Sequence, residues 1–585
     1  MAGVKLVIFS PVKMALGIKR THLRRWGVAL AGAAVSLLVF VLYLETLAPT
    51  VLYYARPAMF DSAMLQTEAS VLGIGHPTGY PTYMMLTHLF TYLPVGDVAY
   101  RTNLASAVYG FAAVIVVYLI GLRLSKRVVA AVAGALAFGV GETFWSQAVI
   151  AEVYTLDALL LSLTIFALLV WRDRREDRYL LLSAFLTGLS LTHHLTSGLL
   201  IPAGLAFVFL VNKPSLTSGR SLLKRVRPSL GVPSGLVSAH LVNNWRLPKV
   251  RLLLQGVGLF LVGLTPYLYL PIRAVMDAPL NESDPSSLER FLLLITGASY
   301  LPVLFDGNIY YTVSALEFED FYSRMLLYGE HLFGQFPLVL VLAGMLGIIH
   351  TLSTDRAATA LLGTLFGGIL VFVFWYIAKG VEDFYVFFIP AHLVFCLWIS
   401  VGIGVMLRSM EDLEVKFSTP KKAFLLVLSA IALTVPLVHV ENTYKAQDRS
   451  QDYNGRRIVE AVAQNAEPNA TVLHHRSPLW YMVLVEQRRQ DLKLVDPFFT
   501  SWVRYNDIVW PDPLNLGESN ARYETEDRTG VGAARQAAKR GHVYVLDQEF
   551  DQNKAERFLE AGFHVVPIEE GLLYELVPLY NPEST

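Results

Sequence analysis

The sequence predicts a polytopic α-helical membrane protein that carries a soluble α/β domain at its C-terminal end. Of its 585 residues, 54% are hydrophobic and only 16% are charged, which is typical of multi-spanning membrane proteins rather than soluble enzymes. Apolar runs long enough to cross a bilayer recur up to residue 440. Beyond Glu441 the hydropathy drops, and short apolar stretches alternate with helical patterns.

The first 25 residues form a basic leader with six Lys and Arg, which we expect to lie in the cytoplasm. The apolar run that follows, 26–48, is too long for the h-region of a signal peptide. It also lacks a convincing small-x-small cleavage site. We therefore predict an uncleaved first span.

A multi-spanning membrane domain is predicted over 26–440, with about eleven spans and two long loops, 49–101 and 273–335, on one face. The stretch 212–251 on the other face is rich in Ser, Gly, Pro, Lys and Arg, which is typical of a surface loop. The predicted spans are 26–48, 102–122, 128–148, 153–171, 179–193, 196–211, 252–272, 336–353, 357–378, 384–406 and 423–440.

The distribution of basic residues predicts the orientation of these spans. With the N-terminus inside, the cytoplasmic loops collect 26 Lys and Arg, whereas the opposite loops before the C-terminal domain hold six. By the positive-inside rule, the two long loops and the C-terminal domain are then extracytoplasmic. The membrane would be the cytoplasmic membrane in a prokaryote or the endoplasmic reticulum in a eukaryote.

The C-terminal domain, 441–585, is predicted to fold on its own and to carry no catalysis. It contains 16 Lys and Arg and 23 Asp and Glu, so its net charge is negative. No Gly-rich phosphate loop follows its apolar stretches. Neither a nucleotide site nor a nucleic-acid partner is expected. Its strands are predicted at 471–475, 492–497, 542–547, 563–568 and 572–579.

The first long loop contains the best candidate for chemistry. Asp61 and Glu68 are seven residues apart, so on a helix they share one face about 10 Å apart. Asp61 is either a general base for an acceptor hydroxyl or only an acidic residue that favours a helix N-terminus. The turn from His76 to Pro81 either joins two surface helices or directs His76 and Tyr80 into the same outer pocket.

Further polar residues fall at the outer ends of other spans, where interfacial residues are also ordinary. Glu152 and Tyr154 lie at a predicted hairpin, and Asp383 opens another span. Arg273 ends a span, where it either snorkels or clamps a phosphate. His193 is followed by His194, and adjacent histidines point to different sides of a helix, so we predict no metal site.

Several stretches resemble the family of the animal transmembrane O-mannosyltransferase that acts on plexins and receptor kinases, together with its prokaryotic relatives. They are DSAMLQTEASVLGIGHPTGYPTYMML from Asp61, RTNLASAV from Arg101, FWSQAVIAEVYTLDAL, GLSLTHHLTSGLLIPA and YLPIRA. The resemblance covers about 40–280. It implies a GT-C-like fold, an acidic residue in the first outer loop and a polyprenyl-phosphate sugar donor.

Within this resemblance Asp61 matches the first-loop aspartate of the family, and the stretch from His76 to Pro81 matches its His-Pro-x-Gly-Tyr-Pro turn. The family commonly has a glutamate three residues after the aspartate, and this chain has Met64 there. Glu68 is a further turn along, displaced by about 6 Å, so it cannot simply replace that glutamate. Either Asp61 suffices alone, or the substrate sits differently, or activity has been lost.

The resemblance implies an inverting membrane glycosyltransferase, with mannose as the first guess for the sugar and a protein Ser/Thr or a glycan as acceptor. Asp61 would deprotonate the acceptor hydroxyl, and Arg273 would hold the lipid phosphate. No cofactor is required, and the need for a divalent metal is left open. One alternative is a transporter or lipid flippase, but such proteins usually contain repeated halves and this sequence shows no repeat. The other is a non-catalytic envelope-assembly protein, which is favoured by Met64 at the position of the family's glutamate.

Overall fold

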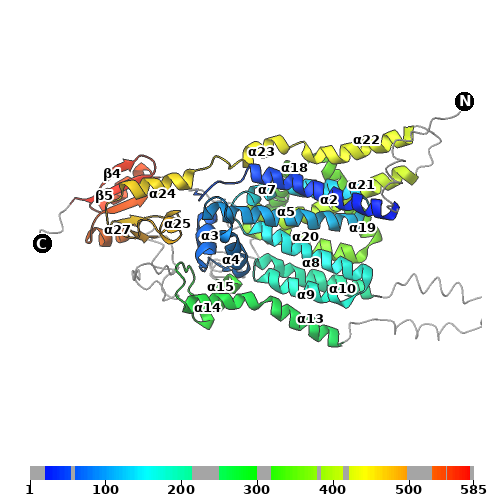
Figure 1. Cartoon of the computed structure of the whole chain (residues 1–585), viewed down its shortest axis with the longest axis horizontal. Coiled ribbons are helices and arrows are strands. Elements are labelled where there is room, and N and C mark those ends of the chain that lie inside the picture. Colours follow the sequence, from blue (N-terminus) through cyan, green and yellow to red (C-terminus); the bar gives the residue numbers. More distant parts are fainter. Residues whose placement is uncertain are drawn as a thin grey trace, which may run out of the picture.

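The computed structural model describes residues 20–53, 60–213, 250–298, 318–377, 384–412, 420–496, 530–548 and 550–579. A long helical bundle occupies one part of the molecule and a small sheet lies at one end of it (Figure 1). The helices of the bundle are α2 (Arg20–Glu45), α5 (Val98–Ser125), α6 (Val128–Gly139), α7 (Glu142–Ala148), α8 (Tyr154–Arg174), α9 (Asp177–Leu191), α10 (Leu200–Asn212), α13 (Val250–Gly263), α14 (Tyr269–Val275), α18 (Phe318–Gln335), α19 (Leu338–Thr354), α20 (Arg356–Ile377), α21 (Ile389–Asp412), α22 (Pro420–Thr434) and α23 (Val440–Gln447).

Among the described residues, eight helical segments are long and apolar enough to cross a membrane, or up to ten if two bent helix pairs each count as one span. The pairs bend by 64° between α6 and α7 and by 116° between α18 and α19. Ten of the eleven predicted spans are among these candidates. The eleventh, 179–193, is α9, which runs from the end of the bundle at Arg175 to the opposite end at His193, although its 15 residues, or about 22 Å, are shorter than a hydrocarbon core of about 30 Å.

Helix α21 lies at the centre of the bundle and is almost wholly buried. It packs closely on α19 because two glycines let the backbones meet. A Cβ atom on Gly347 would lie 1.9 Å from the carbonyl oxygen of Trp398, and one on Gly402 would lie 1.8 Å from that of Ala343. Small residues at such crossings are the usual solution in membranes.

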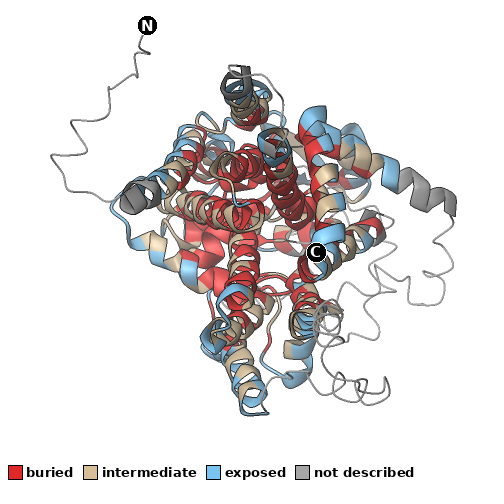
Figure 2. Cartoon of the chain, turned by 90° about the vertical axis from the view of Figure 1, so that its right-hand side faces the viewer, coloured by how far each residue is buried: buried red, intermediate tan, exposed pale blue. Residues whose placement is uncertain are grey.

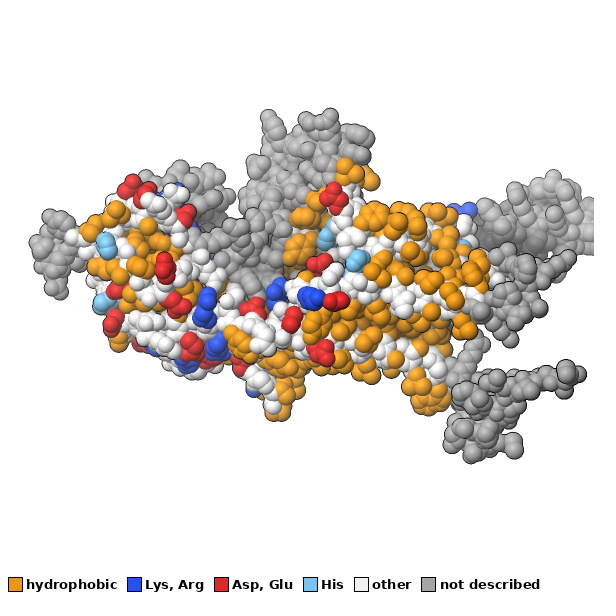
Figure 3. All heavy atoms as spheres, turned by 90° about the horizontal axis from the view of Figure 1, so that it is seen from above, with side chains coloured by type: hydrophobic (Ala, Val, Ile, Leu, Met, Phe, Trp, Pro, Cys, Tyr) orange, Lys and Arg blue, Asp and Glu red, His pale blue; other side chains and the backbone are white. Residues whose placement is uncertain are grey.

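Buried residues gather along the middle of the bundle, and exposed ones lie around it (Figure 2). The outer helices expose large apolar side chains, among them Trp26 of α2, Leu254 of α13 and Leu426 of α22. Hydrophobic side chains cover most of the described surface of the helical part, whereas charged ones gather over the sheet and where it meets the bundle (Figure 3). This surface identifies an integral membrane protein.

The five strands form one sheet in the order β2-β1-β3-β5-β4. β1 is parallel to β2 and β3, and the other pairs are antiparallel. Each strand lies where an apolar stretch predicted one. Their bounds are β1 (Thr471–Leu473), β2 (Lys493–Val495), β3 (Val543–Leu546), β4 (Phe563–Glu569) and β5 (Leu573–Pro578), and the accompanying helices are α24 (Asn454–Asn465), α25 (Leu479–Leu484), α27 (Val531–Ala538) and α28 (Gln552–Glu560).

The C-terminal domain shares a hydrophobic core with both long loops of the membrane domain. Val51, Met64 and Leu280 are buried in one cluster with Val459 and Trp480. Because these apolar side chains cover each other across the junction, removal of either part would expose the other. This shared core argues against the expectation that 441–585 folds on its own.

The connections between the spans contain further short helices. Within the second long loop, α15 begins after Ser287, whose side chain caps the helix by accepting from the backbone N–H of Arg290. The remaining elements are α3 (Phe60–Val71), α4 (Pro81–His88), α15 (Leu288–Thr296), η1 (Leu89–Tyr92), η2 (Leu195–Leu199), η3 (Thr265–Leu268), η5 (Phe384–Phe388) and η6 (Val435–Leu437).

Candidate active site

Helix α3 carries the two acidic residues of the first loop. Asp61 lies in its first turn, where the helix dipole favours a negative charge, and its side chain is 35% exposed. Glu68 lies two turns further on and is fully buried. Between them, Met64 faces the core shared with the C-terminal domain. The position at which the family has a glutamate is thus an apolar contact in this chain.

A second loop adds a buried glutamate that the sequence did not single out. The backbone N–H of Ile74 donates to the carbonyl oxygen of Leu280 (2.8 Å), and that of Glu282 donates to the carbonyl oxygen of Ile74 (2.9 Å). This short parallel bridge sets Glu282 beside Glu68. The space is so tight that a Cβ atom on Gly75 would lie 2.9 Å from Oε2 of Glu68.

Arg476, from the loop that follows β1, reaches the same place. Its Nη2 lies 2.8 Å from Oδ1 of Asp61 and 3.6 Å from Oε1 of Glu282. The same nitrogen donates to Nδ1 of His76 at 3.2 Å. The neutral His76 ring therefore carries its proton on Nε2, which faces Oδ2 of Asp61 at 3.6 Å. We refer to Asp61, Glu68, His76, Glu282 and Arg476 as the carboxylate cluster.

The charges of the carboxylate cluster shift its pKa values in opposite directions. Burial raises the pKa of Asp61, but the charge of Arg476, followed by those of His76 and His475 when they are protonated, brings it below its ordinary value. Burial, followed by the negative charge of Glu282, raises the pKa of Glu68 well above its ordinary value. Asp61 is thus an ionised carboxylate, while Glu68 favours its protonated form.

A group of aromatic and imidazole rings adjoins the cluster through Tyr80. This residue has a left-handed backbone (φ 41°), and its ring lies 5.1 Å from that of His76. On its other side it meets the rings of His193 and His194, each at 6.4 Å. The ring of Tyr154 continues the group, 5.7 Å from His194. Such rings can form the wall of a sugar or lipid site.

The structure gives other predicted site residues local partners. Arg273 donates to the carbonyl oxygens of Val71 and Leu72 at the C-terminal end of α3, about 16 Å along the helix from Asp61. It supports the helix end there. Arg101 likewise donates to three carbonyl oxygens of the chain that leads into α5, those of Thr91, Val95 and Gly96.

Two buried candidates lie near the start of α8. The backbone N–H of Val153 donates to Oε2 of Glu152 (3.3 Å), and Nε2 of His193 donates to the carbonyl oxygen of Val153 (2.8 Å). Asp383 lies outside the described residues.

Of the predicted site residues, the structure brings Asp61, Glu68 and His76 together. Tyr80 adjoins His76, and the rings of His193 and Tyr154 extend the group from Tyr80.

Sequence reasoning missed Glu282 and Arg476. Glu282 belongs to an Asn-Glu-Ser tripeptide in the second long loop, and Arg476 follows an apolar stretch in the sequence HHRSP. The position of Arg476 just after the carboxyl end of a parallel strand is a signal that points to sites in α/β sheets. Nothing in the local sequence connects either residue to Asp61.

Within the described part of the chain, no group of three or more His, Cys, Asp or Glu is arranged to hold a metal ion. That His193 and His194 form no metal site stays a prediction.

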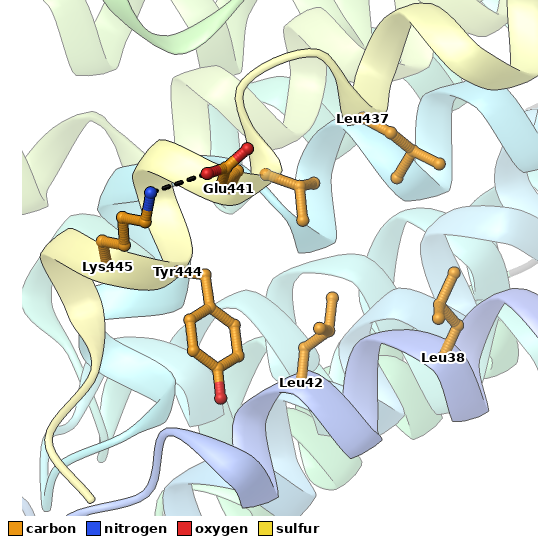
Figure 4. A pocket seen from close by; sticks show the side chains of 7 residues that line it. Leu38, Leu42, Leu437, Glu441, Tyr444 and Lys445 are labelled. Atoms are coloured by element: carbon orange, nitrogen blue, oxygen red, sulfur yellow. Dashed lines mark hydrogen bonds and ion pairs between the residues drawn. The ribbon is translucent and has the colours of Figure 1, made fainter.

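An apolar cavity of about 410 Å³ lies between α2 and the segment η6–α23 (Figure 4). Leu38 and Leu42 line one side, and an ion pair between Glu441 and Lys445 lies on the other. None of its lining residues belongs to the carboxylate cluster.

Comparisons with known proteins agree with this architecture. Residues 61–218 match the family described as "Protein O-mannosyl-transferase TMEM260 N-terminal domain". The mouse protein O-mannosyl-transferase TMEM260 is 29% identical over 240 residues, which are 40% of this chain and 30% of the mouse protein. The corresponding protein of Dictyostelium discoideum is 21% identical over 493 residues, 76% of this chain and 55% of that protein. The chain thus spans about half or less of the length of these curated relatives.

Among solved structures, ArnT from Cupriavidus metallidurans bound to undecaprenyl phosphate superposes with a TM-score of 0.52. The alignment covers 94% of this chain and 98% of ArnT at 13% sequence identity, so it shows the fold alone. Together these findings confirm the resemblance to the O-mannosyltransferase family over residues 61–218, and they show that the chain has a GT-C membrane fold.

Proposed function

We propose that this protein is an inverting glycosyltransferase that moves a sugar from a polyprenyl-phosphate donor to an acceptor hydroxyl. The observation that carries the proposal is the state of Asp61: an ionised, partly exposed carboxylate where the helical bundle meets the sheet. A base that takes a proton from a hydroxyl must be ionised and accessible. ArnT, which shares the fold, binds undecaprenyl phosphate.

The reaction needs one proton transfer and one displacement. Asp61 takes the proton of the acceptor hydroxyl as its oxygen attacks the anomeric carbon. The bond between that carbon and the phosphate oxygen breaks, and polyprenyl phosphate departs with the electron pair. Attack from the face opposite the leaving group inverts the anomeric centre. Mannose and a protein Ser/Thr are the proposed sugar and acceptor, because both curated relatives are named protein O-mannosyl-transferases.

The donor phosphate requires a cation, for which Arg273 is our candidate. A guanidinium can bind phosphate through two parallel hydrogen bonds. In the structure its donors meet the carbonyl oxygens at the end of α3, about 16 Å along the helix from Asp61, so the guanidinium would have to leave them to reach a phosphate whose sugar lies beside Asp61. The aromatic group around Tyr80 and Tyr154 would line the sugar site.

We propose that this site faces the extracytoplasmic side. The carboxylate cluster and the sheet lie at the same end of the bundle, because Arg476 joins them. Arg123 and Arg127, at the C-terminal end of α5 and the loop beyond it, mark the other end. The positive-inside rule assigns that basic end to the cytoplasm.

The position of the charges favours an enzyme over a transporter or flippase. Transporter sites lie near the membrane midplane between repeated halves. In this chain the carboxylate cluster lies where the bundle meets the sheet, on connecting segments rather than within candidate spans.

Sugar transfer can be tested with the purified full-length chain in lipid nanodiscs. The chain would be incubated with labelled polyprenyl-phosphate mannose, glucose or N-acetylglucosamine and a Ser/Thr-rich acceptor protein. We expect one donor, polyprenyl-phosphate mannose, to be consumed with release of polyprenyl phosphate and labelling of the acceptor. Consumption of none of the donors would contradict the proposal.

A further inference from the structure

The loop 474–477 carries the one residue of the C-terminal domain that belongs to the carboxylate cluster. The Arg476 side chain is only 12% exposed, and its Nη2 lies within 3.6 Å of polar atoms of Asp61, His76 and Glu282. These three residues come from two different loops of the membrane domain. A side chain from a third segment therefore lies at the centre of the group.

The loop is built to hold this arginine in place. Arg476 adopts a left-handed backbone conformation (φ 41°), which L-residues other than Asn and Asp rarely adopt. Its backbone N–H donates to Oδ2 of Asp496 at 2.8 Å. On either side, Nδ1 of His475 meets Oδ1 of Asp496 (3.1 Å), and Ser477 pairs with Nδ1 of His474 (2.9 Å). Backbone strain held by such contacts is characteristic of functional sites.

Further contacts fix the loop against the membrane domain. The hydroxyl of Tyr53 donates to the carbonyl oxygen of His475 at 3.2 Å, and the backbone N–H of Ala99 donates to the hydroxyl of Tyr481 at 3.0 Å. Arg456 pairs with Asp97 at 3.1 Å. The placement of Arg476 relative to Asp61 therefore depends on the docking of the whole C-terminal domain.

We propose that Arg476 is a positioning residue for Asp61, through which the C-terminal domain completes the active site. The inference rests on the proposed function. Arg476 does not react itself; it orients the carboxylate and offsets the negative charge around it. This assigns a part in the active site to a domain that the sequence predicted to carry no catalysis.

Removal of the guanidinium would change the charge balance at Asp61. The titratable groups that face Asp61 are Arg476 and His475 from the C-terminal loop, His76 from the first loop, Glu68 from α3 and Glu282 from the second loop. Without Arg476, burial and the negative charge shared by Glu68 and Glu282 would favour protonated Asp61. A neighbouring opposite charge lowers the pKa of a carboxyl by about one to three pH units, so its loss should raise the pKa of Asp61 by a similar amount.

The protonation of Asp61 can be followed without any catalytic turnover. Carbodiimides react with protonated carboxyls, so labelling of Asp61 against pH, read by mass spectrometry on the full-length chain in nanodiscs, reports its titration. In Arg476→Gln we expect the labelling midpoint to move upward by about one to three pH units. Arg488→Gln is the matched control, since Arg488 lies in the same domain but pairs with Glu460 at 2.7 Å. Its midpoint should equal that of the parent.

The same variants test the role in turnover. In Arg476→Gln the acidic limb of the pH profile of kcat/KM should move upward together with the labelling midpoint, whereas a merely structural role would lower the rate at all pH values alike. A labelling midpoint of Arg476→Gln equal to that of the parent would overturn the proposal. If the parent transfers no sugar at any pH, the proposed function fails, and labelling still decides the role of Arg476.

Arg476→Lys covers the case in which Arg476→Gln does not fold. Lysine keeps the positive charge but lacks the planar fork that reaches several partners. We expect a smaller upward movement of the labelling midpoint and slower transfer at an unchanged KM for the donor. Parental labelling and a parental rate in this variant would overturn the proposal.

Discussion

The buried pair of Glu68 and Glu282 allows a quantitative prediction for Glu68→Gln. Both side chains are fully buried, and Glu282 acts on Glu68 both through its negative charge and through a side-chain hydrogen bond. Two adjacent carboxyls in a low-dielectric site cannot both ionise at low cost, so they share a proton. An amide at position 68 would donate a hydrogen bond to Glu282 without needing that proton.

The pH at which the substitution acts follows from the direction in which the pKa of Glu68 moves on folding. That pKa is raised in the folded state, chiefly by burial and then by Glu282. The contribution of Glu68 to stability is therefore complete below the unfolded pKa of about 4.3 and is lost as pH rises through the folded value. A difference of one pH unit between the folded and unfolded pKa corresponds to about 1.36 kcal/mol of unfolding free energy. With one new hydrogen bond to a buried carboxylate, Glu68→Gln should be more stable than the parent by about 1–3 kcal/mol at pH 8.

Thermal unfolding followed by tryptophan fluorescence in detergent, from pH 5 to 9, measures this effect. The Tm of the parent should fall toward alkaline pH more steeply than that of Glu68→Gln, and the two should converge near pH 5. Glu289→Gln, which changes an exposed glutamate of α15, is the control and should follow the parent. A lower Tm of Glu68→Gln at pH 8 would refute the shared proton. Sugar transfer by Glu68→Gln should fall less than about tenfold.

Three further predictions concern the donor, the orientation and the C-terminal domain. Arg273→Lys should raise the KM for the donor with little change in kcat, because a point charge replaces a bidentate fork; an unchanged KM would remove Arg273 from the donor site. Single cysteines introduced at the exposed positions Val95 and Gln451 should react with a membrane-impermeant reagent on intact cells, whereas a cysteine at Lys126 should not. The native Cys396 is buried and should add little labelling of its own. The reverse pattern would invert the topology. Residues 444–585 expressed alone should aggregate, because their core is shared with Met64; a soluble, cooperatively unfolding fragment would show that the core is not shared.

The sequence predicted the elements well, because hydrophobic length and periodicity are local properties. All five strands and ten of the eleven spans lie where their apolar runs indicated. The eleventh, α9, is shorter than a hydrocarbon core, which shows how little length separates a span from a shorter helix of the bundle.

The composition of the site was only partly predictable. Asp61 and His76 meet because a single helix and turn connect them, whereas Glu282 and Arg476 arrive through tertiary contacts between residues about 200 to 400 positions apart. Arg273 was predicted to bind the phosphate because an arginine side chain suits that ligand, but in the structure it donates to the carbonyl oxygens at the end of α3. That partnership depends on where the helix ends in space.

The rate of sugar transfer by Asp61→Asn tests the central claim most directly. Asparagine keeps the shape of the side chain and can still pair with neighbours, but it cannot accept a proton from a hydroxyl. With polyprenyl-phosphate mannose and a protein acceptor in nanodiscs, we expect transfer to fall by about 10²–10⁴-fold while donor binding is unchanged. Glu68→Gln, on the same helix, should stay within about tenfold of the parent. Transfer by Asp61→Asn at the parental rate, with Glu68→Gln inactive, would contradict the account and identify Glu68 as the base.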